Sequence, residues 1–119
     1  MISFPKVAVL FGALTLIAPV PALAESWVQL NERMTIDADS VLMSGDMRTY
    51  WLQFDDGSQS SIVSHEIVNC VTGKKETMES VFYNASGRAV YKKHFRPGEK
   101  TKYIIPGSNG AMILDFVCR

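Results

Sequence analysis

The chain has 119 residues, with twelve basic and twelve acidic side chains and 47% hydrophobic residues. A chain of this length forms one domain, and so small a domain buries only about 60–65% of the surface that its unfolded chain exposes, which limits the stability of its core. The balanced charge gives no indication of a nucleic-acid partner. The two basic segments, Lys74-Lys75 and Lys92–Arg96, are typical of solvated turns and edge strands rather than of a nucleic-acid-binding surface.

The first twenty-four residues have the pattern of a cleavable signal peptide. Lys6 precedes the apolar run Val7–Val20, and small residues follow at the positions that signal peptidase reads, so we expect cleavage between Ala24 and Glu25. The alternative is an uncleaved anchor, but the run is shorter than the roughly 20 apolar residues that span a bilayer. We therefore expect an exported protein.

Residues 25–119 are expected to form one domain. Loss of the leader removes one lysine and no acid, which leaves a net charge of about −1. Later hydrophobic runs are interrupted by charges or turn residues, so no integral membrane segment is predicted after cleavage. Glu25 stands where a bacterial lipoprotein carries its lipid on cysteine, so no lipid anchor is expected.

The sequence contains two cysteines, Cys70 and Cys118. In an oxidising compartment such a pair becomes a structural disulfide, and closing a loop of about 49 residues is worth roughly 4 kcal/mol in the chain-entropy model. Redox-active pairs usually lie two residues apart, and a zinc site needs about four ligands, whereas this chain adds only His65 and His94. We predict the disulfide, with no metal and no cofactor.

The first half of the mature chain is predicted to form short strands. Gly45-Asp46 is a turn signal that predicts a hairpin, and Tyr50, Leu52 and Phe54 share one face of the strand that follows it, with Arg48 at its exposed end. The strands predicted here are Ser26–Leu30, Met34–Asp37, Val41–Ser44 and Met47–Phe54.

The second half continues the pattern of strands separated by turns. Asp55–Ser58 has turn chemistry because Asp-Gly tolerates positive φ, and Arg96–Glu99 contains Pro-Gly. Apolar and polar residues alternate along both sides of the strand that ends at Tyr83. The strands predicted here are Ile62–Cys70, Glu76–Tyr83, Arg88–Phe95 and Thr101–Ile105.

The C-terminal segment, 111–118, fits both a strand and a helix. We predict a helix, because Pro106-Gly107 interrupts the preceding strand and Ser108 is a good N-cap. Two i,i+4 pairs, Met112 with Phe116 and Ile113 with Val117, would lie on one helical face. A helix of about ten residues is marginal alone, so packing on the sheet and the disulfide must hold it.

Several pieces of the chain, in this order and spacing, resemble the bacterial surface-adhesin protein E family. These are Trp27, Ile36-Asp37 with Ser40, Tyr50-Trp51, Asn69-Cys70, and Ile104–Ser108 with Val117-Cys118. The resemblance covers nearly the whole mature chain. It implies an α+β, mostly β domain: a twisted antiparallel sheet of about six strands, with a C-terminal helix tied on by the Cys70–Cys118 disulfide.

The residues contain no recognisable catalytic centre, so we expect that the protein is not an enzyme. His65 and Glu66 are neighbours in a strand and point to opposite faces, so they cannot readily serve one site as base and acid. His94 lies in the lysine-rich segment, and motifs for nucleophilic serine, phosphate or zinc-protease chemistry do not occur. His65 is interpreted as an ordinary strand residue.

The favoured hypothesis is an exported binding module of a Gram-negative envelope, adhesin-like, located in the periplasm, secreted or at the cell surface. Its partner would be a host or envelope protein, and a homodimer could use the same surface. The candidate interface residues are Trp51, Tyr83 and Tyr91, because their strands carry apolar groups on both faces and one helix covers only part of one face. The alternative is that these aromatic residues only pack the core or pair across strands.

Two other functional classes stay open. One is a periplasmic structural or envelope-stress protein without a dedicated ligand. The other is a small-molecule carrier, which the expected architecture disfavours because one sheet with one short helix leaves little volume for a ligand pocket.

Overall fold

The computed structural model describes residues 26–119, and the predicted signal peptide and its cleavage point lie outside this range. The described chain forms an eight-stranded sheet, a short 3-10 turn (η3) and one α-helix. Their bounds are β1 Trp27–Asn31, β2 Met34–Asp37, η3 Ala38–Ser40, β3 Leu42–Ser44, β4 Met47–Asp55, β5 Ser61–Asn69, β6 Lys74–Tyr83, β7 Ala89–His94, β8 Thr101–Tyr103 and α1 Asn109–Val117.

All strand pairs in the sheet are antiparallel, and six strands form a continuous path in the order β1-β2-β4-β5-β6-β7. Two short strands complete it: β3 pairs with the start of β4, and β8 pairs with the start of β6. The predicted α+β, mostly antiparallel architecture is therefore confirmed. All eight strands predicted from the residues are present, whereas the family resemblance implied about six. The continuous path has six strands, and β3 and β8 pair with parts of β4 and β6 that β2 and β7 leave unpaired.

Residue alternation along the long central strands separates two faces of the sheet. In the β4–β5 register, Tyr50 lies opposite Glu66, and Trp51 lies opposite His65. Tyr50 and Glu66 are buried, whereas Trp51 and His65 are half-buried. Since successive strand residues point to opposite sides, Tyr50 and Glu66 belong to one face and Trp51 and His65 to the other. The predicted opposition of His65 and Glu66 is confirmed.

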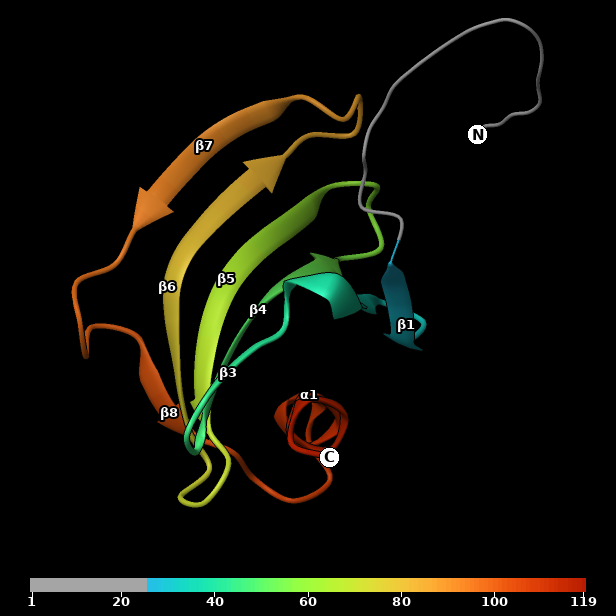
Figure 1. The fold of residues 1–119 in the computed structure, drawn as a ribbon. Coiled ribbons are helices and arrows are strands. Elements are labelled where there is room, and N and C mark those ends of the chain that lie inside the picture. The colour runs from blue at the N-terminus through green and yellow to red at the C-terminus, as the bar shows by residue number, and fades with distance from the viewer. Residues whose placement is uncertain (1–25) are drawn as a thin grey trace, which may run out of the picture.

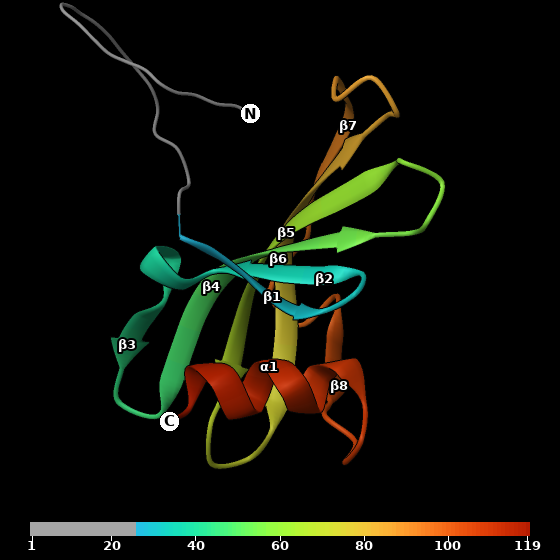
Figure 2. The same cartoon turned by 90° about the vertical axis from the view of Figure 1, so that its right-hand side faces the viewer.

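The sheet curves around α1, which lies inside the curve and covers part of the concave face (Figure 1). Figure 2, seen from inside the curve, shows the helix in front of the lower part of the strands, and Figure 1 shows no helix on the outer, convex side of the described sheet. The predicted helix is confirmed, and the side chain of Ser108 caps it by accepting a hydrogen bond of 3.2 Å from the Ala111 N–H.

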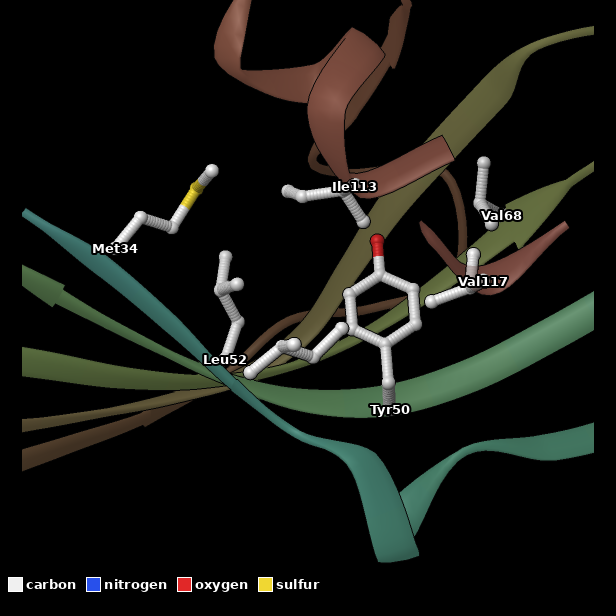
Figure 3. Packing of buried hydrophobic residues seen from close by; sticks show 7 residues of the cluster. Met34, Tyr50, Leu52, Val68, Ile113 and Val117 are labelled. Atoms are coloured by element: carbon white, nitrogen blue, oxygen red, sulfur yellow. The ribbon is translucent and has the colours of Figure 1, made fainter. Parts of the chain in front are cut away.

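The core is a cluster between the concave face and α1. Figure 3 shows the Tyr50 side chain rising from the sheet toward Ile113 and Val117 of the helix. Of the two predicted helical pairs, Ile113 and Val117 are buried, whereas Met112 remains 43% exposed and Phe116 is half-buried. The buried hydrophobic residues are Met34, Ile36, Tyr50, Leu52, Val68, Ile113 and Val117.

The end of α1 is fastened to the sheet. Cys70, just after β5, forms the predicted disulfide with Cys118, their Cα atoms 5.7 Å apart, so this prediction is confirmed. Beside it, Arg48 Nε donates a hydrogen bond of 3.1 Å to the carbonyl of Val117 in the last helical turn. A cation at the C-terminal end of a helix also complements the helix dipole. The covalent and polar contacts together fix which part of the concave face the helix covers.

Candidate functional site

A buried polar network lies on the concave face around Glu66. The Glu66 carboxylate accepts three hydrogen bonds: Oε1 from the Tyr50 hydroxyl at 3.1 Å, and Oε2 from Lys75 Nζ at 3.0 Å and Thr77 Oγ1 at 3.3 Å. The Lys75 and Glu66 side chains are only 12% and 7% exposed, so this is a buried ion pair. Such a pair needs good geometry and further donors to offset its desolvation, and Glu66 has both.

Strand register brings the four residues of this network together. Glu66 of β5 faces Tyr50 of β4 on one side and Thr77 of β6 on the other, and an irregularity in the β5–β6 pairing falls between His65 and Glu66. Burial, together with the neighbouring Glu66 carboxylate and the hydrogen bond to it, raises the pKa of Tyr50 far above its ordinary value. Tyr50 is therefore a neutral donor at all physiological pH values.

Sequence reasoning missed this network. From the sequence, Glu66 is interpreted only as a possible catalytic partner of His65, although a glutamate at an inward position of a strand is itself a signal that it must have a partner. That partner, Lys75, lies in what was predicted as a turn; β6 begins two residues earlier than expected, at Lys74.

A cavity of about 500 Å³ opens between the concave face and the start of α1. This volume is within the usual range of ligand pockets, roughly 300–1,000 Å³, so the expectation that this architecture leaves too little room was wrong. The room exists because the curved sheet is much larger than its one short helix. The cavity is lined by apolar Met34, Leu52, Phe54, Ile62, Ile104, Ile105 and Ile113, by polar Ser64, Glu66, Lys75, Lys102, Tyr103, Ser108 and Asn109, and by Gly110.

The polar wall of the cavity carries an excess of positive charge. Lys75 of β6 lies directly opposite Lys102 of β8 in an antiparallel pair, and both residues line the cavity. Glu66 is the one acidic residue in the lining, and it is already paired with Lys75. Lys102 is exposed and forms no ion pair with any residue in the range 26–119.

The convex face has an aromatic pair at its centre. The rings of Trp51 and His65 stack with centroids 4.6 Å apart and planes 6° from parallel. In the strand register the half-buried Val63, Ile67 and Val81 surround this pair on the same side of the sheet. Thr49 and Gln53 flank Trp51 along β4, and Glu79 lies directly opposite His65, so the surface has an aromatic and aliphatic centre with polar neighbours. No helix of residues 26–119 covers it (Figure 1).

The three candidate interface aromatics do not lie on one surface. Trp51 and Tyr83 alternate onto the convex side, since Tyr83 pairs with Ser61 in register with Val63 and Val81. Tyr91 lies opposite Phe82 on the concave side, where the two rings are 5.4 Å apart and Tyr91 is 57% exposed. The structure thus joins Trp51 to His65 and separates both from Tyr91.

Ionic contacts flank the convex apolar surface toward the β7 edge. Glu79 of β6 pairs with Lys92 Nζ at 3.2 Å and with His94 Nδ1 at 3.5 Å. Lys92 and His94 are 55% and 70% exposed, so these are ordinary solvated contacts of a sheet edge. They support the interpretation of the basic run as an edge-strand face.

Two further properties bear on the class of protein. Within residues 26–119, no helix is long and apolar enough to cross a membrane. In the same range, no three His, Cys, Asp or Glu side chains are grouped so that they could hold a metal ion.

Known structures share this fold. Haemophilus influenzae protein E, in its selenomethionine form, aligns with a TM-score of 0.59 and 16% identity over 86% of this chain and 92% of that one. Protein E from non-typeable Haemophilus influenzae aligns with a TM-score of 0.56 and 14% identity over 86% of this chain and 81% of that one. At these identities the likeness shows a common fold.

Sequence comparison assigns the family. No curated protein is similar enough in sequence to count as a relative. The family described as surface-adhesin protein E, in contrast, matches residues 27–119, which is the whole described domain except its first residue. The resemblance seen in the sequence is thereby confirmed, and the chain belongs to the surface-adhesin protein E family.

Proposed function

We propose that this protein is a non-enzymatic binding module of the bacterial envelope that contacts a protein partner through the convex face of its sheet. The partner is a host or envelope protein, and a second copy of the chain can use the same surface. The observation that carries the proposal is the stacked Trp51–His65 pair, with aliphatic neighbours, on a surface that no helix of residues 26–119 covers.

The composition of this surface fits a protein partner. Aromatic residues are enriched at the centres of protein interfaces, and charged residues are enriched at their rims. Here Trp51 is central, with Val63 and Ile67 beside it, and Glu79, which lies opposite His65, forms its ionic contact with Lys92 of the edge strand β7. The curvature of the sheet presents this surface outward (Figure 1).

Family membership supports an adhesin-like role, and export is part of the proposal. The signal-peptide pattern of residues 1–24 and the Cys70–Cys118 disulfide both fit an oxidising compartment outside the cytoplasm. Glu25 in place of a lipid-bearing cysteine favours a secreted or periplasmic protein over a lipid-anchored one.

The test is solid-phase binding of the purified protein to a panel of host extracellular proteins, with light scattering over a concentration series to detect a dimer. Trp51→Ala and His65→Ala are expected to lower binding at least tenfold, as loss of a central aromatic contact does. Tyr91→Ala is the matched control, since Tyr91 is an exposed aromatic residue on the other face. Circular dichroism and thermal unfolding establish that each variant is folded.

Each outcome is decisive for the convex face. Loss of binding in folded Trp51→Ala, with Tyr91→Ala unaffected, supports the convex face as the interface, whether the partner is a host protein or a second copy. Loss only in Tyr91→Ala would move the interface to the concave face. Full binding in both Trp51→Ala and His65→Ala would overturn the proposal and favour a structural or envelope-stress protein without a dedicated ligand.

A further inference from the structure

The cavity on the concave face has the size and the mixed lining of a small-molecule site. Its volume is about 500 Å³, and its walls are mostly hydrocarbon. Phe54 and Ile62 lie on the helix-facing side of β4 and β5, yet both stay half-buried, and Ile105 is 69% exposed. These apolar side chains are not fully covered because α1 is only nine residues long and the concave face is much wider. A hydrocarbon chain in the cavity would complete their burial.

The charge at one end of the cavity indicates the sign of the ligand's polar group. Lys75 and Lys102 are directly opposite on neighbouring strands, an arrangement in which like charges repel. Glu66 neutralises Lys75, and its carboxylate already accepts three hydrogen bonds, so it offers little to a ligand. Lys102 has no counterion in the described chain, and Ser108 and Asn109 at the positive end of the helix line the same cavity.

We propose that this cavity binds a single-chain amphipathic anion, with its hydrocarbon chain along Phe54, Ile62 and Ile113 and its head group against Lys102. A carboxylate there would supply the counterion that Lys102 lacks in the described chain. This site is independent of the convex protein-binding surface, because the sheet lies between the two.

The probe is dodecanoate, titrated below its micelle concentration into the methyl-labelled purified protein and followed by NMR. Saturable shifts are expected for the methyl groups of Ile62, Ile104 and Ile113, and none for Ile67 on the convex face. Two control ligands have the same chain: dodecanol lacks the charge, and dodecyltrimethylammonium has the opposite charge. We expect each to bind at least roughly tenfold more weakly than dodecanoate, because charge-assisted hydrogen bonds are stronger than neutral ones.

Lys102→Glu is the variant that tests the head-group contact, and Lys100→Glu is its matched control. Both lysines are exposed, lie two residues apart and carry the same charge, but only Lys102 lines the cavity. Lys102→Glu is expected to weaken dodecanoate binding at least about tenfold, whereas Lys100→Glu leaves it within about twofold. Equal thermal unfolding of both variants shows that the fold is kept.

Three results would overturn the proposal. One is the absence of saturable shifts at the cavity methyl groups. Another is equal weakening by Lys102→Glu and Lys100→Glu, which would reduce the effect to overall charge. The third is sedimentation with phosphatidylglycerol vesicles that depends on Lys102 while dodecanoate does not bind, which would assign Lys102 to a membrane surface instead.

Discussion

The concave and convex faces of this sheet are built from neighbouring residues of the same strands, yet they have opposite physical character. On the concave side, Tyr50 and Glu66 are buried under α1 in a hydrogen-bonded network. On the convex side, Trp51 and His65, which are the sequence neighbours of Tyr50 and Glu66, stack against one another without a covering helix in the described chain. The difference teaches that one short helix decides which face becomes core.

This asymmetry also separates two kinds of binding. A face that is half covered and strongly curved leaves a partly open cavity, which suits a small ligand. A face that is uncovered and convex has no volume to enclose, so it suits a broad contact with another protein. The disulfide at Cys118 ties the C-terminal end of the helix to the sheet, and the start of the same helix lines the cavity.

Removal of the disulfide is expected to have the largest effect, because it frees the end of the helix that covers the concave face. Cys70→Ala with Cys118→Ala opens a link between residues 48 positions apart, and we expect the free energy of unfolding to fall by about 4 kcal/mol because the unfolded chain gains loop entropy. Urea unfolding of the oxidised protein and the double variant measures it. A loss below about 1 kcal/mol would show that packing alone holds α1 in place.

The second largest difference between the two faces is expected when an ion pair loses one partner. Lys75→Met leaves Glu66 buried without its counterion, and we expect a loss of about 3 kcal/mol, moderated by the donors Tyr50 and Thr77. Lys92→Met removes the convex contact with Glu79, where exposure limits the expected loss to about 0–1 kcal/mol. Chemical denaturation of the two variants gives the comparison, and equal losses would contradict it.

The buried phenol should add a pH dependence that originates on the concave side. Tyr50 in the unfolded chain ionises near pH 10, while its folded-state pKa is raised well above this. Above pH 10 the unfolded chain therefore loses a proton that the folded protein keeps, so stability falls as the pH rises, by up to about 1.4 kcal/mol per pH unit. Urea unfolding in alkaline buffers should show this slope in the wild type.

Tyr50→Phe is the control for that slope, because it removes the ionisable hydroxyl and keeps the ring. The variant should be less stable at neutral pH, since Glu66 loses one donor, but its stability should fall less steeply above pH 10. An unchanged slope in Tyr50→Phe would assign the alkaline loss to other groups.

The last comparison concerns two adjacent residues of β4 that lie on opposite faces. Trp51 is half-buried and its neighbour Leu52 is buried, so Trp51→Ala should cost about 1 kcal/mol and Leu52→Ala about 3 kcal/mol. Thermal or urea unfolding of the two single variants measures both values. A larger loss for Trp51→Ala than for Leu52→Ala would make Trp51 a core residue and weaken its role as an interface.

Much of the fold could be predicted because its signals are local. Alternation placed Tyr50, Leu52 and Phe54 on one face, Ser108 marked the start of the helix, and the positive φ of Gly57 follows from the expected Asp-Gly turn. The buried pair of Glu66 and Lys75 could not be predicted, because it depends on the β5–β6 register and on the irregularity between His65 and Glu66. Local patterns do not specify register between strands that meet only in the folded sheet.

The sequence by itself determined the strands and their turns, the helix, the pairing of the two cysteines and membership of a family, since each of these depends on residue type and spacing along the chain. Tertiary structure decided which face of the sheet is covered, that Trp51 stacks on His65 while Tyr91 lies on the other side, and that Lys75 and Lys102 meet at a cavity. These features arise from curvature and strand register, which bring together residues that are distant in the sequence.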